Sequence, residues 1–344
     1  MASFFHCGFD SHLSFDSAEG GDSSCHKLCI RALDELKLDP KYGGKIKKAF
    51  IGWCTVFVVT ESGHLLFISK SVFSKTSVIE CNLTKSWDLK LLECGTRDIY
   101  LVLSDRVIRR WQSENFKLEP KIVDPLVQSG VKVSEISVGS TFVCVLLEDG
   151  SVKGMDEEES PVNFDPISGD RFINVSCGHE HILLLTESGK IYSYGRGSKG
   201  QLGHENLDDC FEQQKEIEAL SGLKIMAISA GGWHSLALSE FGDVYAFGWN
   251  EHGQLGIGTD EMIKAIPTLI NIENINFISI GCGSRHSMAA SKDGNLYAFG
   301  WNKYGQLGIP PDDQNNQRTP LKIDFNRKVV SVDCKYWSSL IEAI

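Results

Sequence analysis

One 27-residue motif occurs three times, and this repetition constrains the fold more than any other feature of the chain. The copies are AGGWHSLALSEFGDVYAFGWNEHGQLG at 230–256, CGSRHSMAASKDGNLYAFGWNKYGQLG at 282–308 and, more loosely, CGHEHILLLTESGKIYSYGRGSKGQLG at 177–203. A motif that recurs every ~50 residues is typical of repeat architectures, in which each copy forms one supersecondary unit. We therefore expect a repeat protein rather than a single irregular core.

The distance between two glycines of the motif identifies weaker copies upstream and downstream. Gly231 and Gly242 are 11 residues apart, and so are the equivalent glycines of the other two copies. The same spacing identifies two degenerate copies, and two further copies lack one of the glycines. The seven copies have as their first position Gly52, Gly95, Gly139, Gly178, Gly231, Gly283 and Cys334. Copies of this size predict propeller blades rather than helical solenoids, and the recurring glycines indicate a turn that side chains would obstruct.

The pattern inside each copy predicts β-strands. LALSEFGDVYAFGW alternates and is rich in β-branched, aromatic and aliphatic residues, which is typical of two strands joined by a hairpin. Short helical turns are expected at most at 30–36 or 211–220. In the fifth copy we expect four strands, at 224–230, 233–239, 243–249 and 266–272. The sequence therefore predicts an all-β protein, a seven-bladed β-propeller of four-stranded antiparallel blades.

The two ends of the chain are expected to share the last blade. Eleven residues beyond Cys334 would be position 345, whereas the missing half-motif appears as FHCGFD at 5–10, which aligns with YAFGWN at 245–250. C-terminal strands at 328–333 and 336–342 would then pair with N-terminal strands near 3–9 and 24–31, which removes exposed sheet edges. The expected organisation is one propeller over 1–344, with N-terminal strands of blade 7 at 1–35, divergent blades 1–3 at 36–165, regular blades 4–6 at 166–325 and C-terminal strands of blade 7 at 326–344.

Composition excludes several classes of function. The net charge of −11 argues against a large DNA-binding surface, which would need clustered Lys and Arg. Positions 1–9 lack the charged and apolar regions of a signal peptide, and no run of about 18 apolar residues predicts a membrane span. Eleven cysteines without an export signal indicate reduced thiols in cytosol or nucleus.

Several chemically active residue types recur at one position of the motif and are expected to be structural. A catalytic histidine needs one position and a tuned partner, whereas this chain repeats its histidine in three blades. The recurring residues are His181, His234, His286, Gln201, Gln254 and Gln306. We expect the histidines to be buried and hydrogen-bonded and the glutamines to bond loop backbone, so the sequence predicts neither an enzyme nor a cofactor.

An N-terminal set of histidines and cysteines is a candidate zinc site. Its members are His6, Cys7, His12, Cys25, His26 and Cys29. Cys25 and Cys29 have tolerable spacing, but no second close pair follows at the distance of a zinc finger, and Cys7 falls on a predicted strand. No metal site is expected.

Residues that vary in kind at one loop position are better candidates for function. In an antiparallel blade the first turn and the third-to-fourth loop lie at the same end, and the first turn borders the central channel. The second residue after the first position is Cys54, Arg97, Thr141, Glu180, Trp233, Arg285 and Tyr336, and the loops add Arg196, Trp249, Asn250, His252, Trp301, Asn302 and Tyr304. Trp, Tyr and Arg are the side chains that anchor protein interfaces. This end is therefore a candidate interface; the alternative is that Trp249 and Trp301 pack between blades.

Two other regions are candidate contacts. An acidic run, Asp156, Glu157, Glu158 and Glu159, lies between the third and fourth strands of blade 3. It is either a solvated loop or a contact for a basic partner. Blades 1–3 have lost the shared motif while keeping the strand pattern, either by drift or because their surface suits a partner.

The repeated residues resemble the regulator-of-chromosome-condensation repeat family. They are GGWHS at 231–235, VYAFGWN at 244–250 and GQLG at 253–256, with their counterparts in the sixth copy. The resemblance implies a seven-bladed propeller acting as a non-enzymatic adaptor. It also implies a JmjC-domain lysine demethylase/arginine hydroxylase as partner, with roles in histone H3 lysine methylation, chromosome segregation and mitotic spindle organisation. The resemblance further implies histones or microtubule-associated factors as partners and a location in nucleus and cytoplasm, and we expect a monomer outside complexes.

The same resemblance raises two alternatives. The family's founder is a guanine-nucleotide exchange factor for a Ran-like small GTPase, with a basic N-terminal tail and an inserted wedge in blade 3. Here the 39 residues from Gly139 to Gly178 form the shortest step, which leaves little room for an insertion. Plant ultraviolet receptors share the repeat and use tryptophan clusters, but their Gly-Trp-Arg-His-Thr motif is replaced by GWHS at 232–235.

Overall fold

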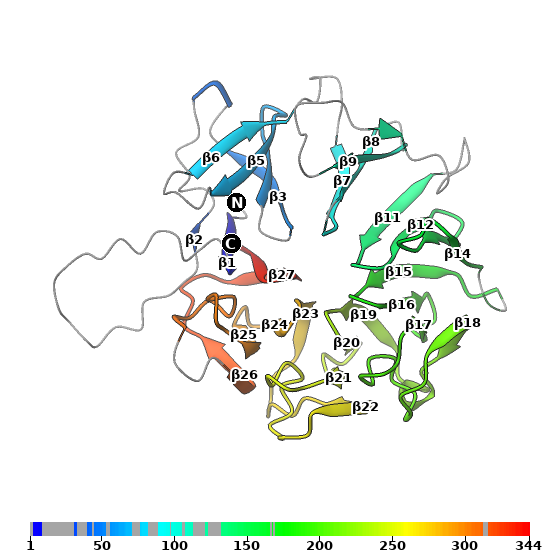
Figure 1. Ribbon diagram of the computed structural model, residues 1–344. Helices are drawn as coiled ribbons and strands as arrows, with labels where there is room; N and C mark the ends of the chain where they lie inside the picture. Colours follow the sequence, from blue (N-terminus) through cyan, green and yellow to red (C-terminus); the bar gives the residue numbers. More distant parts are fainter. Residues whose placement is uncertain are drawn as a thin grey trace.

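In the computed structural model, the described part of the chain forms seven four-stranded sheets arranged in a ring (Figure 1). The described residues are 3–8, 31–32, 40–42, 45–52, 56–70, 76–81, 89–96, 98–104, 107–112, 121–122, 132–165, 167, 169–311 and 316–344. Each sheet is one antiparallel blade, and its lowest-numbered strand lies nearest the axis of the ring, except in blade 7, where β27 does. The fold prediction, a propeller of seven four-stranded antiparallel blades, is confirmed.

The strands of the first six blades follow one another along the chain. Blade 1 comprises β3 (Ile46–Ile51), β4 (Val56–Thr60), β5 (Leu65–Lys70) and β6 (Thr76–Glu80). Blade 2 comprises β7 (Leu89–Cys94), β8 (Asp98–Leu103), β9 (Ile108–Gln112) and β10 (Lys121–Ile122). Blade 3 comprises β11 (Val133–Val138), β12 (Val143–Leu147), β13 (Val152–Met155) and β14 (Pro161–Phe164).

Blades 4–6 follow the same order. Blade 4 comprises β15 (Phe172–Cys177), β16 (His181–Thr186), β17 (Ile191–Gly195) and β18 (Cys210–Glu216). Blade 5 comprises β19 (Ile225–Ala230), β20 (His234–Ser239), β21 (Val244–Trp249) and β22 (Ile263–Leu269). Blade 6 comprises β23 (Phe277–Cys282), β24 (His286–Ser291), β25 (Leu296–Trp301) and β26 (Asn316–Ile323). Short 3₁₀ helices lie at Pro40–Tyr42 and Glu218–Leu220.

Blade 7 is built from both ends of the chain, as the sequence predicts. Its strands are β27 (Val329–Lys335), β28 (Ser338–Ala343), β1 (Ser3–Gly8) and β2 (Arg31–Ala32), in that order outward from the axis. The N-terminal β1 pairs antiparallel with β28, with Phe5 opposite Ile341. This pairing closes the ring, so the two ends of the sheet array hold each other.

Two predicted outer strands differ from the structure. The last strand of blade 5 is β22 at Ile263–Leu269 rather than 266–272. The buried Asn250 side chain donates to the carbonyls of Thr259 and Glu261 and so holds the preceding loop close to the sheet. The strand therefore begins three residues before the predicted start. In blade 7, β2 comprises Arg31–Ala32, so it meets only the end of the predicted 24–31, and the rest of that prediction lies outside the described residues.

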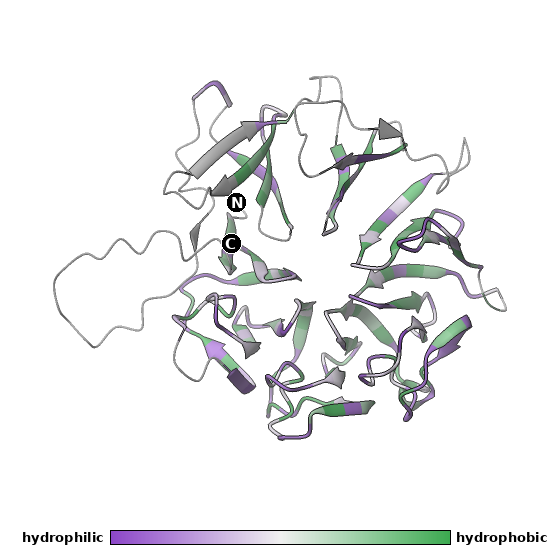
Figure 2. Ribbon diagram, in the orientation of Figure 1, coloured by the Kyte–Doolittle hydropathy of each residue, from purple (hydrophilic) through white to green (hydrophobic). Residues whose placement is uncertain are grey.

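The hydrophobic core lies between the faces of neighbouring blades. One cluster joins Leu236 and Leu255 of blade 5 to Phe277 and Phe299 of blade 6, all almost fully buried. Hydrophobic residues follow the inner strands, whereas an outermost strand such as β26 is largely hydrophilic (Figure 2). Each blade therefore buries both faces against its neighbours, which explains why the strands nearest the axis are so apolar.

The recurring histidines form a buried bond between blades. His181 Nε2 lies 2.9 Å from Ser235 Oγ in the next blade, and that hydroxyl donates to the Gln201 carbonyl at 2.9 Å. Because the serine proton is used in this second bond, the histidine N–H is the donor in the first. His234 bonds Ser287, and His286 bonds Ser339, in the same way. Burial lowers the pKa of His181, His234 and His286 to about 3, so they are neutral at physiological pH.

The glycines and glutamines of the motif have local roles beside this bond. A Cβ on Gly178 would lie 2.3 Å from the His181 ring, so only glycine leaves room for the buried histidine. Gln201 accepts the Lys199 N–H at 2.8 Å within its loop. In the same way, Gln254 accepts the His252 N–H and Gln306 accepts the Tyr304 N–H, each at 2.9 Å.

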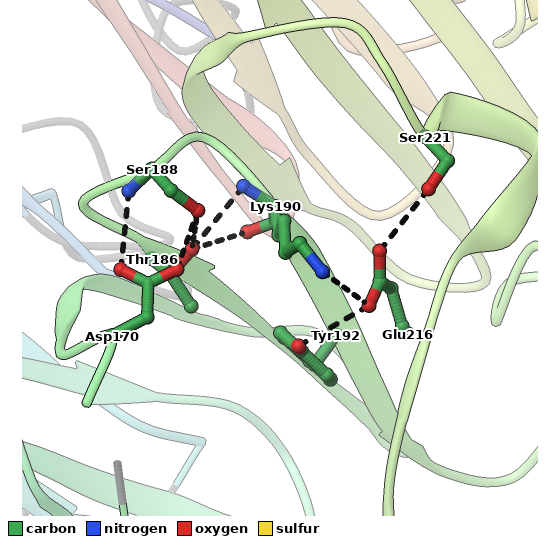
Figure 3. Close-up of polar contacts among 7 residues, drawn as sticks. All are labelled: Asp170, Thr186, Ser188, Lys190, Tyr192, Glu216 and Ser221. Carbon is green, nitrogen blue, oxygen red and sulfur yellow. Dashed lines mark hydrogen bonds and ion pairs between the residues drawn. The ribbon is translucent and has the colours of Figure 1, made fainter. Parts of the chain in front are cut away.

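A polar network ties the second-to-third hairpin of blade 4 to neighbouring loops (Figure 3). The Ser188 hydroxyl donates to Asp170, and the Thr186 hydroxyl accepts the Lys190 N–H at 3.2 Å. The Lys190 ammonium lies 3.0 Å from Glu216 of β18, which joins the hairpin to the outer strand. A threonine or serine also occupies the position of Thr186 in blades 1, 5 and 6. Its hydroxyl there accepts the N–H of the residue four positions later, which indicates a role in the turn.

The possible zinc set is only partly described. His6 and Cys7 are buried in β1, and the Cys7 thiol donates to the Gln306 carbonyl at 3.4 Å. The other four members lie outside the described residues. Within the described part of the chain, no three His, Cys, Asp or Glu side chains gather as metal ligands. No helix found there is both long and apolar enough to span a bilayer.

Candidate protein-interaction face

The first turns and the third-to-fourth loops meet at one end of the ring axis. Trp249 N donates to the Trp233 carbonyl at 2.8 Å, and Trp301 N donates to the Arg285 carbonyl at 2.8 Å. Arg196 and Glu180 repeat this contact in blade 4 at 2.9 Å. The backbone itself therefore brings the two sets of predicted loop residues together in blades 4–6.

In the seventh blade the repeat register is one residue later than the sequence spacing indicates. Cys334 pairs with Ser339 just as Cys282 pairs with Ser287, so Cys334 occupies the buried slot before the first position. The first position of blade 7 is therefore Lys335. The observed strand pairing identifies the equivalent residues directly. Glycine spacing could not do so in this copy, because its first glycine is missing.

This shift changes which residue of blade 7 faces the axis. Trp337, not Tyr336, is the counterpart of Trp233 and Arg285. Tyr336 is buried with a positive φ of 51° and lies in the turn next to it. Burial raises the pKa of Tyr336 to about 12, so the phenol stays protonated.

A single arginine is surrounded by three tryptophans at this end of the axis. The Arg285 guanidinium carbon lies 5.2 Å from the ring centre of Trp249, 5.4 Å from Trp301 and 5.7 Å from Trp337. These distances are within the range of cation–π attraction. Arg285 Nη1 also donates to His252 Nε2 at 3.0 Å. Burial and the arginine charge lower the pKa of His252, which keeps the imidazole a neutral acceptor.

Further aromatic contacts extend this group around the axis. Trp233 meets Trp249 at 5.5 Å, and Trp301 meets Tyr304 at 5.4 Å and Trp337 at 5.2 Å between ring centres. The Trp233 indole donates to Glu180 at 2.9 Å. All of these rings are half-buried, so each packs against its neighbours and keeps part of its surface in water. The aromatic mouth is defined by its residues Trp233, Trp249, Arg285, Trp301 and Trp337.

A cavity of about 180 Å³ opens beside the aromatic mouth. Its floor is the backbone of the first turns, including Gly139, Gly178 and Gly283, and its walls include Trp233 and Trp337. A Cβ on Gly178 would meet the Gly231 carbonyl at 2.5 Å, so these turns approach each other more closely than side chains allow. The arrangement can take one apolar or aromatic side chain of a partner, with Arg285 at its edge.

The predicted acidic run borders an adjoining, more polar cavity of about 260 Å³. Asp156, Glu157 and Glu159 line it together with Asp98, and it shares Gly139 with the first cavity. Glu158 lies in the same five-residue loop between β13 and β14, where its N–H bonds the Asp156 carboxylate. Arg110 also lines this cavity and pairs with Glu159 at 3.3 Å, which leaves the other carboxylates in excess. The face therefore combines an apolar aromatic half with a half of net negative charge.

One charged residue of this region was not anticipated from the sequence. Lys335 reaches across the axis, and its ammonium lies 2.7 Å from the Glu93 carboxylate of blade 2 and 2.6 Å from the Val138 carbonyl of blade 3. Burial alone would lower the pKa of Lys335, but the Glu93 charge raises it above its ordinary value. Lys335 thus joins blade 7 to blades 2 and 3.

Replacement of this lysine tests its role. Lys335→Met is expected to lower the free energy of unfolding by about 2 kcal/mol, because Glu93 is left without its counter-charge. The double variant Lys335→Met/Glu93→Met should recover most of this loss, as measured by urea unfolding followed by circular dichroism. Equal losses in the single and double variants would contradict the proposed pairing, and exposed Lys328→Met serves as the control.

The remaining predicted residues are distributed unevenly. Arg97 and Cys54 lie outside the described residues, so their positions at this face stay predictions. Trp337, His179 and Lys335 line the cavity but were not among the predicted contacts. Trp337 could have been found from the sequence by aligning Ser339 with Ser235 and Ser287 instead of searching for a glycine.

Comparison with known proteins places the chain among propellers of one family. The model of the RCC1-like domain matches residues 21–341. RCC1 domain-containing protein 1 of Mus musculus is 33% identical over 214 residues, covering 51% of this chain and 56% of that protein. The Ultraviolet-B receptor UVR8 of Arabidopsis thaliana is 32% identical over 219 residues, covering 60% of this chain and 49% of the receptor. The chain thus spans about half the length of these relatives.

Solved structures show the same fold. The crystal structure of Prp20p from Saccharomyces cerevisiae aligns with a TM-score of 0.79 at 18% identity, covering 100% of this chain and 91% of that chain. The relatives support a regulatory or interaction role. Since the family model covers nearly the whole chain, the resemblance seen in the sequence is confirmed: the chain belongs to the RCC1-like domain family.

Proposed function

We propose that this propeller is a protein-binding adaptor and that the aromatic mouth is its principal contact surface. The observation that carries the proposal is Arg285 held among three tryptophans beside an apolar cavity. Trp, Tyr and Arg dominate the binding energy of protein interfaces when they lie at the centre of a contact. Here these side chains are already positioned by the fold, so little ordering is needed on binding.

The partner we propose is a JmjC-domain lysine demethylase/arginine hydroxylase, in chromatin regulation, chromosome segregation and spindle organisation. Support comes from the similarity to RCC1 domain-containing protein 1, which extends over half of each chain. The acidic half of the face, with Asp156, Glu157 and Glu159, suits a basic stretch of that partner or of a histone. Nuclear and cytoplasmic localisation belongs to the same proposal.

Affinity purification with quantitative mass spectrometry tests this function. We expect the full chain to recover a JmjC-domain oxygenase, and Arg285→Ala/Trp337→Ala to recover it at least tenfold less, because the double variant removes the centre of the surface. Leu269→Ala, an exposed residue on the outer strand β22, is the matched control and should bind like the unaltered chain. Equal recovery by both variants would contradict the proposed surface.

Nucleotide exchange on a Ran-like GTPase is the alternative function. The binding of Prp20p to Gsp1p and histones concerns a protein that shares 18% identity with this chain, which bears on the fold alone. A nucleotide-release assay with purified chain and fluorescently loaded Ran separates the two. The adaptor proposal expects release at the uncatalysed rate.

A further inference from the structure

The innermost strand of every blade carries a β-bulge at the same position. In each blade the pairing between the first two strands shifts after the first residue, so that the second residue has no opposite partner. A bulge pushes its extra residue out of the regular ladder and re-aims the side chain. The extra residues, here named the bulge ring, are Lys47, Lys90, Ser134, Ile173, Met226, Ile278 and Val330.

The bulge ring lies at the end of the axis opposite the aromatic mouth. In blades 4–7 the residue before the bulge bonds the second-to-third hairpin of the preceding blade, as in Ile225 N to Gly189 O at 3.1 Å and Phe277 N to Gly242 O at 2.9 Å. In an antiparallel blade those hairpins lie at the end away from the first turns. Because the inner strands surround the axis (Figure 1), equivalent bulges form one rim.

Four consecutive blades place an exposed aliphatic side chain on this rim. Ile173 is 43% exposed, Met226 54%, Ile278 48% and Val330 39%. The extra residue of a bulge needs no particular side chain, and blades 1–3 use lysine or serine there. Four exposed apolar residues thus occupy equivalent positions in neighbouring blades along one arc of the rim, and exposed apolar patches mark sites of protein contact.

The charge beside this patch indicates the chemistry of its partner. The apolar arc ends with Val330 of blade 7, and the next blade presents the exposed pair Lys47 and Lys48. Arg171, near the other end of the arc, is already paired with Glu187 at 3.0 Å. Within the described residues, Lys47 and Lys48 have no such ion pair, so two unpaired positive charges lie beyond the Val330 end of the apolar arc.

We propose that the bulge ring docks an extended segment of a partner protein that carries aliphatic side chains followed by carboxylates. The aliphatic side chains cover the arc from Ile173 to Val330, and the carboxylates lie against Lys47 and Lys48. This surface is separate from the aromatic mouth, so one propeller holds two protein segments at the two ends of its axis. The inference does not depend on the identity of the partner at the mouth.

A phage-displayed library of random twelve-residue peptides, selected on the full chain, tests the proposal. We expect the selected peptides to be enriched in Leu, Ile or Val next to Asp or Glu. Synthetic copies measured by fluorescence polarisation should bind Met226→Ser/Ile278→Ser at least tenfold more weakly, since the centre of the arc is lost. Lys47→Glu/Lys48→Glu should also weaken them and remove most of the salt dependence.

Exposed Leu269→Ser is the matched control, and thermal unfolding of each variant checks that the fold is kept. Three results would overturn the proposal: no selected peptide, peptides of basic composition, or selected peptides that bind Met226→Ser/Ile278→Ser as tightly as the unaltered chain. Sedimentation at high concentration addresses a second copy of the chain as the occupant. If the unaltered chain self-associates and Met226→Ser/Ile278→Ser does not, the patch is a contact between two copies of the chain instead.

Discussion

Deletion of residues 338–344 is expected to abolish the cooperative unfolding transition of the whole propeller. These residues form β28, which lies between β27 and the N-terminal β1, so its loss separates the two ends of the ring. It also removes Ser339, which receives the buried bond from His286 of blade 6. Two newly exposed strand edges and an open core would promote aggregation rather than a smaller stable array.

A graded form of this experiment separates closure from a general effect of truncation. Ile341→Ala removes a fully buried side chain opposite Phe5 and should cost about 3 kcal/mol. Ile344→Ala makes the same change at a 57% exposed position three residues away and should cost less than about 0.5 kcal/mol. Differential scanning calorimetry measures both, and an unchanged melting temperature for the deletion would show that blade 7 does not close the ring.

Acidification is expected to destabilise the protein strongly between pH 6.5 and pH 4. Burial lowers the pKa of His181, His234 and His286 to about 3, whereas the unfolded chain binds their protons near the ordinary value of 6.5. The unfolded state therefore holds more protons in this range, and stability falls as pH falls below 6.5. At pH 5 each histidine costs about 2 kcal/mol, and the three together about 6 kcal/mol.

Urea unfolding at pH 7.5 and pH 5.0 measures this dependence. His234→Gln keeps a donor for Ser287 but cannot titrate, so the difference between the two pH values should shrink by about 2 kcal/mol. The variant is expected to be less stable at pH 7.5, because the amide fills the site less well. A pH difference that the substitution leaves unchanged would show that this histidine does not carry the acid sensitivity.

The spacing of glycines in the sequence was sufficient to predict the propeller and its closure, because each copy repeats one backbone turn. Outer strands were harder to predict, since their bounds depend on side chains such as Asn250 that fold the preceding loop. The aromatic mouth was only partly predictable. Trp233 and Arg285 occupy one motif position, and Trp301 occupies another. Trp337 could be assigned only from the strand register, because blade 7 has lost its first glycine.

Long-range contacts had no signal in the sequence. Lys335 meets Glu93 across the axis from 242 residues away, and each is a charged residue at a position that most other blades fill with an uncharged one, so the repeat pattern does not predict the pair. The bulge ring was equally hidden, because a bulge changes the pairing of strands and not the pattern of residues. The deviating residues, rather than the repeated ones, therefore carry what is individual to this propeller.

Site-specific photo-crosslinking measures most directly whether the aromatic mouth is the partner surface. A photoreactive phenylalanine analogue is placed at Lys303, which is exposed in the third-to-fourth loop of blade 6 next to Tyr304, and separately at Leu269 on the outer strand β22. We predict that a JmjC-domain oxygenase crosslinks from position 303 and not from position 269. Crosslinking from position 269 alone would contradict the assignment of protein binding to the aromatic mouth.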